Sequence, residues 1–150
     1  MSQENIEVVK RVAEAWNRDD LDAFIDLLDP DIEWYPAIER SFEGRESAFS
    51  RMVALWIGGT EVRRGHAGVR KGWESYSGEE VESLEVRLDE IRDLGESVLA
   101  LGEMKITGRT SQLELTSEIA LLSTFRGGKI VSAHDFMSHA EGLEAAGLRE

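Results

Sequence analysis

Residues 113–137 read LELTSEIALLSTFRGGKIVSAHDFM, and this stretch decides the fold. Apolar and polar residues alternate on both sides of Gly127-Gly128, which is the pattern of two half-buried strands. Two glycines between such runs are a strong signal for a two-residue hairpin turn. The stretch therefore predicts an antiparallel hairpin, with one strand over 113–125 and the next over 130–137.

A two-residue turn at these glycines pairs Arg126 with Lys129 and, further along, Ala120 with Asp135. The opposite face then carries an apolar set made of Ile119, Leu121, Phe125, Ile130 and Phe136. A second apolar face predicts a partner, most simply a second copy packed through the sheet. The alternative is a sheet that is covered on both sides by its own helices.

The two segments before the hairpin predict two more strands. Leu84, Val86 and Leu88 alternate with charged residues, and residues 98–106 are nearly continuous apolar sequence. The polar turn at 93–96 would join them. Consecutive strands joined by tight turns predict an antiparallel sheet rather than an alternating parallel one.

Helical periodicity marks the start and the end of the chain. Apolar residues recur at helical spacing over 3–17, and Asp19 or Asp20 can cap a second helix that ends at Asp29-Pro30. Helices before strands make the fold class α+β, and residues 1–150 are expected to form one domain. The other expected elements are a strand at 31–35, helices at 44–56 and from His66 to Tyr76, and a last helix at 139–146 that Ser138 caps.

The composition excludes several classes of function. The chain has 17 Lys and Arg against 30 Asp and Glu, a net charge of −13, so we expect neither a nucleic-acid partner nor an anionic membrane surface. It has no cysteine, which excludes disulfides, thiolate metal sites and a cysteine nucleophile. No segment approaches the ~20 apolar residues of a membrane span, and the polar N-terminus is unlike a signal peptide. We therefore expect a soluble, cytoplasmic protein.

Five segments in this order resemble the nuclear transport factor 2-like superfamily and, within it, the SnoaL-like proteins. The likeness covers nearly the whole chain, and the last segment is similar to the tail of bacterial members. The segments are WNRDD at 16–20, LDPDIEW at 28–34, RGHAGVR at 64–70, FRGGKIV at 125–131 and AEGLEAAGL at 140–148.

The resemblance implies a cone in which a curved, mostly antiparallel sheet wraps around the N-terminal helices and leaves an apolar pocket. Family members include a steroid isomerase, an epoxide hydrolase, polyketide cyclases and non-catalytic binding proteins, and dimers packed through the sheet are common among them. Because one fold hosts many reactions, the likeness alone does not assign one.

When single residues are compared, the resemblance favours cyclase-like chemistry over the steroid isomerase mechanism. The three polar groups of the isomerase pattern would fall near Val12, Ala120 and Tyr35, none of which keeps the required group, so that mechanism is rejected. The acid/base Asp of the cyclase pattern matches Asp135. Glu118 would be its diagonal neighbour, and two carboxylates on an apolar surface would raise one pKa toward neutrality. The alternative is an Asp135 that is solvated at the sheet rim or paired with an arginine.

The remaining site candidates are polar or aromatic groups expected near the pocket. They could hydrogen-bond or stack on a ligand, or bind its carboxylate or phenolate; salt bridging and core packing are the structural alternatives. Three scattered histidines predict no metal site, and no motif predicts a cofactor. The ligand-binding candidates are Tyr35, Trp73, Glu118, His66 and Arg70.

The sequence thus leads to three hypotheses. The first is a SnoaL-like protein that binds a small hydrophobic or aromatic molecule, with cyclase- or isomerase-like acid/base chemistry at Asp135. The second is a non-catalytic binding or assembly module with the same fold. The third, an epoxide hydrolase, needs an Asp-Arg-Asp set whose second Asp has no counterpart that we could place.

Overall fold

The computed structural model describes residues 2–35, 62–76, 81–108 and 114–148. The helix expected at 44–56 lies outside these residues. In chain order the elements are α1 (Ser2–Asn17), α2 (Leu21–Asp26), β1 (Leu28–Tyr35), β2 (Arg63–Arg64), α5 (Gly65–Tyr76), β3 (Val81–Asp93), β4 (Ser97–Gly108), β5 (Glu114–Arg126), β6 (Lys129–Phe136) and α6 (His139–Ala145).

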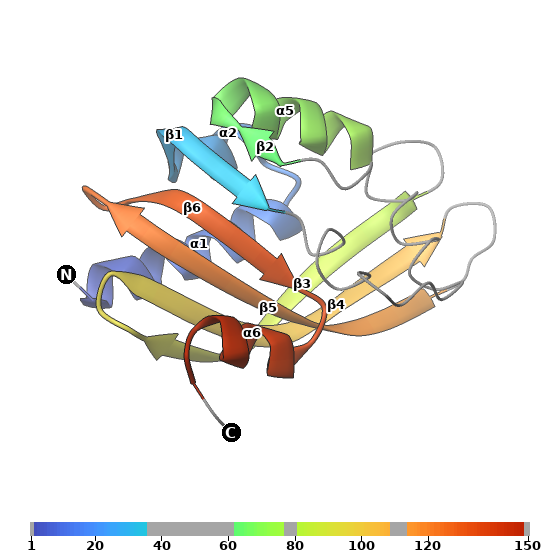
Figure 1. Cartoon of the computed structure of the whole chain (residues 1–150). Helices are drawn as coiled ribbons and strands as arrows, with labels where there is room; N and C mark the ends of the chain where they lie inside the picture. Colours follow the sequence, from blue (N-terminus) through green and yellow to red (C-terminus); the bar gives the residue numbers. More distant parts are fainter. Residues whose placement is uncertain (1, 36–61, 77–80, 109–113, 149–150) are drawn as a thin grey trace.

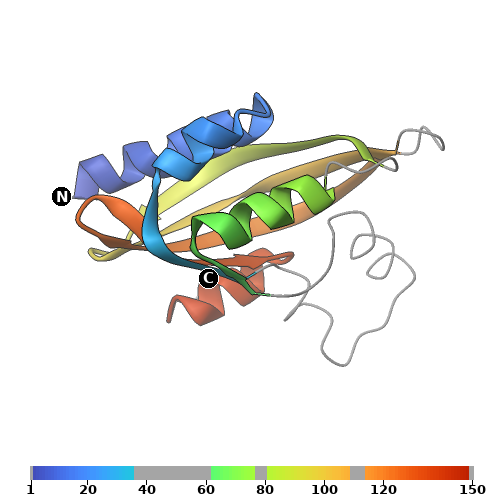
Figure 2. The same cartoon turned by 90° about the horizontal axis from the view of Figure 1, so that it is seen from above.

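The strands form one curved sheet in the order β2-β1-β6-β5-β4-β3. All neighbours are antiparallel except β1 and β6, which run parallel, so the α+β cone with a mostly antiparallel sheet is confirmed. Helices α1, α2 and α5 pack on one face, here called the inner face, and α6 packs on the other, the outer face. Figures 1 and 2 show α1 and α6 on opposite sides of the sheet.

The predicted hairpin forms, but its register is shifted by one residue beyond the turn. Gly127 and Gly128 both have positive φ, and Arg126 pairs with Lys129 as expected. A β-bulge then leaves Val131 as an extra residue, and from there on β5 and β6 pair one position later than a regular ladder would. As a result Asp135 lies opposite Leu121, and the predicted pairing with Ala120 is wrong.

The bulge also reverses the predicted faces of β5. Ile119, Leu121 and Phe125 pack against the core under the helices, whereas Phe136 lies on the outer face under α6. The apolar set proposed as a dimer surface is therefore not one surface. This correction follows from the period of two in a strand, since a slip of one residue moves every side chain to the other face.

Helix α6 forms at its predicted capping box. The Ser138 side chain accepts a hydrogen bond from the Glu141 backbone N–H, as the spacing predicts. The helix lies against β5 at Gly142, where an added Cβ would come within 2.4 Å of the Ala120 Cβ. A close helix approach thus buries Phe136 and Leu143, so the chain covers part of its own outer face.

The polar turn after α1 holds the edge of the sheet. Asp20 caps α2 by accepting from the Ala23 N–H, as predicted. The Asn17 side chain pairs with the edge strand β3: its Nδ2 donates to the Val86 carbonyl at 2.7 Å, and its Oδ1 accepts from the Val86 N–H at 2.8 Å. A side-chain amide thus continues the ladder beyond β3, the last strand at this edge among the described residues.

Asn17→Ala is expected to lower the free energy of unfolding by roughly 1–2 kcal/mol, because two hydrogen bonds to the edge strand are lost at a solvent-exposed site. Asn17→Asp should also destabilise, since its carboxylate cannot donate to the Val86 carbonyl. Urea denaturation measures both. Arg18→Ala, which removes only an exposed ion pair to Asp20, is the control and should change stability by less than about 0.5 kcal/mol. Equal effects of the three substitutions would contradict this role of Asn17.

Within the described parts of the chain, every helix is too short or too polar to span a membrane.

Candidate functional site

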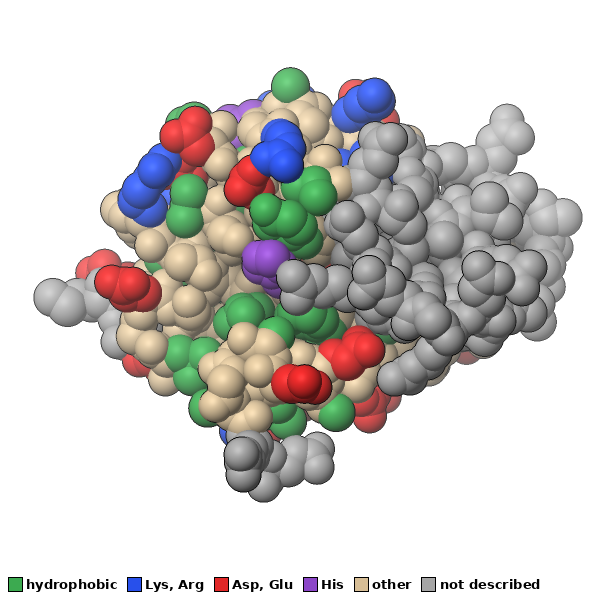
Figure 3. Space-filling view, viewed as in Figure 1, with side chains coloured by type: hydrophobic (Ala, Val, Ile, Leu, Met, Phe, Trp, Pro, Cys, Tyr) green, Lys and Arg blue, Asp and Glu red, His purple; other side chains and the backbone are tan. Residues whose placement is uncertain are grey.

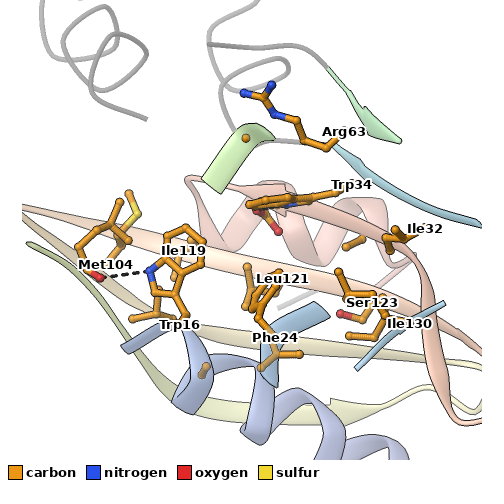
Figure 4. Close-up of a pocket in the computed structure, with 18 of the residues that line it drawn as sticks. Trp16, Phe24, Ile32, Trp34, Arg63, Met104, Ile119, Leu121, Ser123 and Ile130 are labelled. Atoms are coloured by element: carbon orange, nitrogen blue, oxygen red, sulfur yellow. Dashed lines mark hydrogen bonds between the residues drawn. The ribbon is translucent and has the colours of Figure 1, made fainter. Parts of the chain in front are cut away.

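A cavity of about 120 Å³ lies between the helices and the inner face of the sheet. A cavity of similar size, roughly 150 Å³, holds benzene in another protein, so this one suits a group about as large as a single ring. Figure 4 shows its walls, with side chains from α1, α2 and the central strands turned toward one another and Arg63 of β2 at one side. Its aliphatic walls include Ile32, Leu84, Met104, Ile119, Leu121 and Ile130.

Aromatic side chains form the end of the pocket next to α1 and α2. The Trp16 ring meets Phe24, Trp34 and Trp73 with centroid distances of 5.9, 6.2 and 4.7 Å. The Trp16 indole N–H donates to the Leu84 carbonyl at 3.1 Å, which fixes the ring in place. Trp16, Phe24 and Trp34 line the cavity directly, so one group of rings supports the core and forms the wall of the site.

Asp135 lies in the wall of this apolar cavity. Alternation along β6 puts it on the inner face with Ala133 and Met137, as predicted. Its Oδ2 accepts a 2.6 Å hydrogen bond from the Trp34 indole N–H. Burial raises the pKa of Asp135 from 3.8 to about 7, and the Trp34 hydrogen bond opposes that rise only in part. The carboxyl group therefore exchanges a proton near neutral pH.

Sequence reasoning missed two polar groups of this pocket. Arg63 lines it from β2, and Ser123 lines it from β5; both are buried. Ser123 pairs with Ala133 on the inner face, a position that only the shifted register reveals. Arg63 lies next to Gly68 and Gly72 of α5, and glycines four residues apart in an expected helix were the available signal.

Two of the ligand-binding candidates lie on the outer face, away from the pocket. The Tyr35 ring stacks on His134 with a centroid distance of 4.2 Å. Glu118 accepts a hydrogen bond from the His139 backbone N–H at the start of α6. The predicted proximity of Glu118 to Asp135 is wrong, because the bulge in β6 changes the pairing, and burial raises the Asp135 pKa without a contribution from Glu118.

The other three candidates lie on α5 and make structural contacts. His66 hydrogen-bonds the Leu28 carbonyl through Nε2 at 2.9 Å, and Arg70 forms an exposed ion pair with Asp22. Trp73 is buried behind Trp16, and its indole N–H donates to Asp19 at 3.1 Å. None of the three is among the residues that line the cavity.

Histidines and carboxylates do not gather into a metal site within the described residues. His134 points to the face opposite Asp135, as alternation predicts. The ring of His139 contacts the Gly102 carbonyl at 2.7 Å on the outer side of β4. Figure 3 shows the outer face, on which hydrophobic side chains and a histidine lie among polar and acidic ones.

Solved structures of similar fold cover nearly the whole chain. An NTF2-like protein of unknown function from Burkholderia pseudomallei is 21% identical, with a TM-score of 0.72 over 94% of this chain and 95% of that one. TerC, co-crystallized with polyporic acid, is 19% identical, with a TM-score of 0.70 over 96% and 98%. A protein from Catenulispora acidiphila with a ketosteroid isomerase-like fold, in complex with trimethylamine, is 19% identical, with a TM-score of 0.66 over 95% and 94%. At these identities the likeness shows the fold alone.

Sequence comparison identifies the family. Curated proteins give no significant match. The family model described as the SnoaL-like domain matches residues 9–133, from α1 to β6. Since this match spans most of the chain and the sheet has the NTF2-like arrangement, the protein belongs to the SnoaL-like domain family.

Proposed function

We propose that this protein binds a small, mostly apolar or aromatic molecule in the pocket and that Asp135 exchanges a proton with it. The observation that carries the proposal is a carboxyl group with a pKa of about 7, held by Trp34 in the wall of an apolar cavity. A general acid or base is most effective when its pKa is near the working pH. The reaction class would be proton transfer, as in a cyclase or an isomerase.

The structural relatives support the binding part of this proposal. TerC was crystallized with polyporic acid, and the Catenulispora protein holds trimethylamine, so at least two proteins of this fold accept small organic molecules. The two compounds are of different chemical types, an acid and an amine. The ligand class of this chain therefore has to be argued from its own residues.

A binding module without turnover is the second candidate function. It is favoured by the fact that Asp135 is the single carboxylate among the described residues that line the pocket. The same observation counts against the epoxide hydrolase hypothesis, which requires a second Asp beside an Arg. Asp135 would then serve as a hydrogen-bonding group for the ligand.

A small aromatic probe and a variant with a blocked pocket test ligand binding, whether or not the protein also turns the ligand over. Benzyl alcohol is expected to shift the indole N–H resonances of Trp16 and Trp34 in NMR spectra, because both rings line the cavity. Ala133→Phe places a ring inside the pocket and should weaken this binding by roughly tenfold or more through steric exclusion.

Ser132→Phe is the matched control. Ser132 pairs with Thr124 on the outer face and is adjacent to Ala133, so the same residue type is introduced one position away. The dissociation constant of Ser132→Phe for benzyl alcohol should equal that of the wild type within about twofold. Equal binding by the wild type and Ala133→Phe would show that the probe binds elsewhere.

Two further properties belong to this proposal and rest on the sequence. One is a cytoplasmic location, which fits a chain without cysteine, as is common in a reducing compartment. A homodimer packed through the sheet would use the outer face, where Tyr35 and His134 stack beside the area that α6 covers. The five residues first proposed for that contact cannot form it together, since Ile119, Leu121 and Ile130 line the pocket on the inner face.

A further inference from the structure

We propose that Arg63 binds the anionic group of the pocket's ligand, so that the protein selects small aromatic or apolar organic anions over neutral and cationic molecules of the same shape. This inference rests on the proposed binding function and goes beyond it by naming the ligand class and the residue that selects it. Three observations support it: the position of Arg63 in the pocket wall, the two glycines of α5 that leave space for its side chain, and the apolar character of most other lining residues.

Arg63 occupies a protected place in the pocket wall. It lies on the two-residue strand β2, opposite Trp34 of β1. It is only 7% exposed and lines the cavity, whereas the adjacent Arg64 is exposed and pairs with Glu33. Figure 4 shows Arg63 on the same side of the pocket as Trp34, opposite the side that Trp16 and Phe24 form.

Helix α5 is shaped to receive this side chain. A Cβ added to Gly72 would lie 2.6 Å from Arg63 Nε and 3.2 Å from Cζ, so the guanidinium end rests directly on the glycine. A Cβ at Gly68 would lie 3.3 Å from the Arg63 backbone. Glycine is among the least favourable residues inside a helix, and these two lie on the same helix face. Arg63 and Gly72 both line the cavity, so this side chain and the helix face beneath it form one part of the wall.

The chemistry of this wall fits an organic anion. A guanidinium has five N–H donors in a planar fork, so it can serve a protein group and a ligand carboxylate at once. Arg63 is the one basic side chain among the described lining residues, and a charge interaction in such a poorly solvated wall is stronger than in water. An ammonium ligand would meet a like charge there. Asp135, with a pKa of about 7, is in part neutral at pH 7 and opposes an anion less than an ordinary aspartate would.

Three probes of one shape test the charge preference: phenylacetate, phenylacetamide and phenethylammonium. NMR titrations at pH 7 and low salt give their dissociation constants. Phenylacetate is expected to bind the wild type roughly tenfold more tightly than the amide, and phenethylammonium more weakly than the amide. Arg63→Gln should abolish the preference for phenylacetate and leave amide binding within about twofold.

Two more variants make the test specific. Arg64→Gln changes the adjacent, exposed arginine and should keep the full preference. Gly72→Ala keeps Arg63 but places a methyl group within 2.6 Å of its Nε, so it should reduce the preference by displacing the guanidinium. Since alanine favours helix formation, this variant gives the answer if Arg63→Gln does not fold.

The outcomes separate this inference from the function on which it rests. If the amide binds and phenylacetate shows no advantage, or if Arg63→Gln or Gly72→Ala keeps the advantage, Arg63 does not select the ligand while the binding function stands. Tighter binding of phenethylammonium would also overturn the inference. If none of the three probes binds the wild type, the proposed pocket function itself is wrong.

Discussion

Trp16→Ala is expected to lower the free energy of unfolding by about 3–5 kcal/mol, the usual cost of truncating a large aromatic residue in a core. The ring contacts Phe24, Trp34 and Trp73, and its N–H donates to the Leu84 carbonyl, so the change removes both packing and a hydrogen bond between α1 and β3. For a chain of this size the melting temperature should fall by roughly 10 °C.

Two other variants separate these contributions. Trp16→Phe keeps most of the ring packing and loses the hydrogen bond to Leu84, so its cost should be a minor part of the alanine effect. Glu14→Ala, at an exposed position of the same helix, is the surface control. Calorimetry and urea denaturation measure all three. A Trp16→Ala cost no larger than that of Glu14→Ala would mean that α1 presents a different face to the sheet.

Much of the fold could be predicted because its signals are local. Alternation located the long strands, Gly127-Gly128 located the turn, and Ser138 and Asp20 located two helix starts. Each of these patterns depends on residues close together in the chain, whose backbone preferences are the same in any fold. The family resemblance, carried by five such segments, then predicted a curved, mostly antiparallel sheet around the N-terminal helices.

The site was harder to predict because it depends on pairings between distant segments. Val131 is the extra residue of the bulge, and nothing in the local pattern marks it, yet it moves Leu121 and Ser123 into the pocket and Glu118 out of reach of Asp135. Arg63 escaped attention because a strand of two residues has no periodicity to detect. Asp135 was found through the resemblance, and its side of β6 followed from alternation.

The titration of Asp135 should give stability and activity a shared dependence on pH. Its pKa in the folded state is about 7, against 3.8 as the ordinary value, so between these values the folded protein holds a proton that the unfolded chain has lost. The contribution of Asp135 to the free energy of unfolding is therefore largest below pH 3.8, and it declines as the pH rises toward 7. At about 1.4 kcal/mol for each tenfold change in proton affinity, the decline is roughly 4 kcal/mol.

Asp135→Asn should remove that decline while its amide oxygen still accepts from the Trp34 indole. The variant is thus expected to be more stable than the wild type at pH 8 and to lose this advantage near pH 4.

Asp29→Asn is the control, and its effect on stability should depend on pH in the opposite direction. The Arg126 guanidinium, which donates to both Asp29 oxygens at 2.8 and 3.3 Å, holds the Asp29 pKa below its usual range, so that ion pair stabilises the fold above the ordinary pKa and is lost in acid.

Asp135→Asn also separates an effect on turnover from an effect on ligand binding. General acid/base groups typically contribute about 10²–10⁴-fold to a rate, so Asp135→Asn should reduce turnover by that factor and leave benzyl alcohol binding nearly unchanged. Carbon NMR of the carboxyl group gives the pKa directly, and stability measured between pH 4 and pH 8 reports the linked free energy. A titration near 3.9, the value for free aspartate, would mean that Asp135 is solvated and charged throughout the neutral range. In that case an apolar pocket with a fixed carboxylate would favour the binding module, because such a group has no proton to give at pH 7.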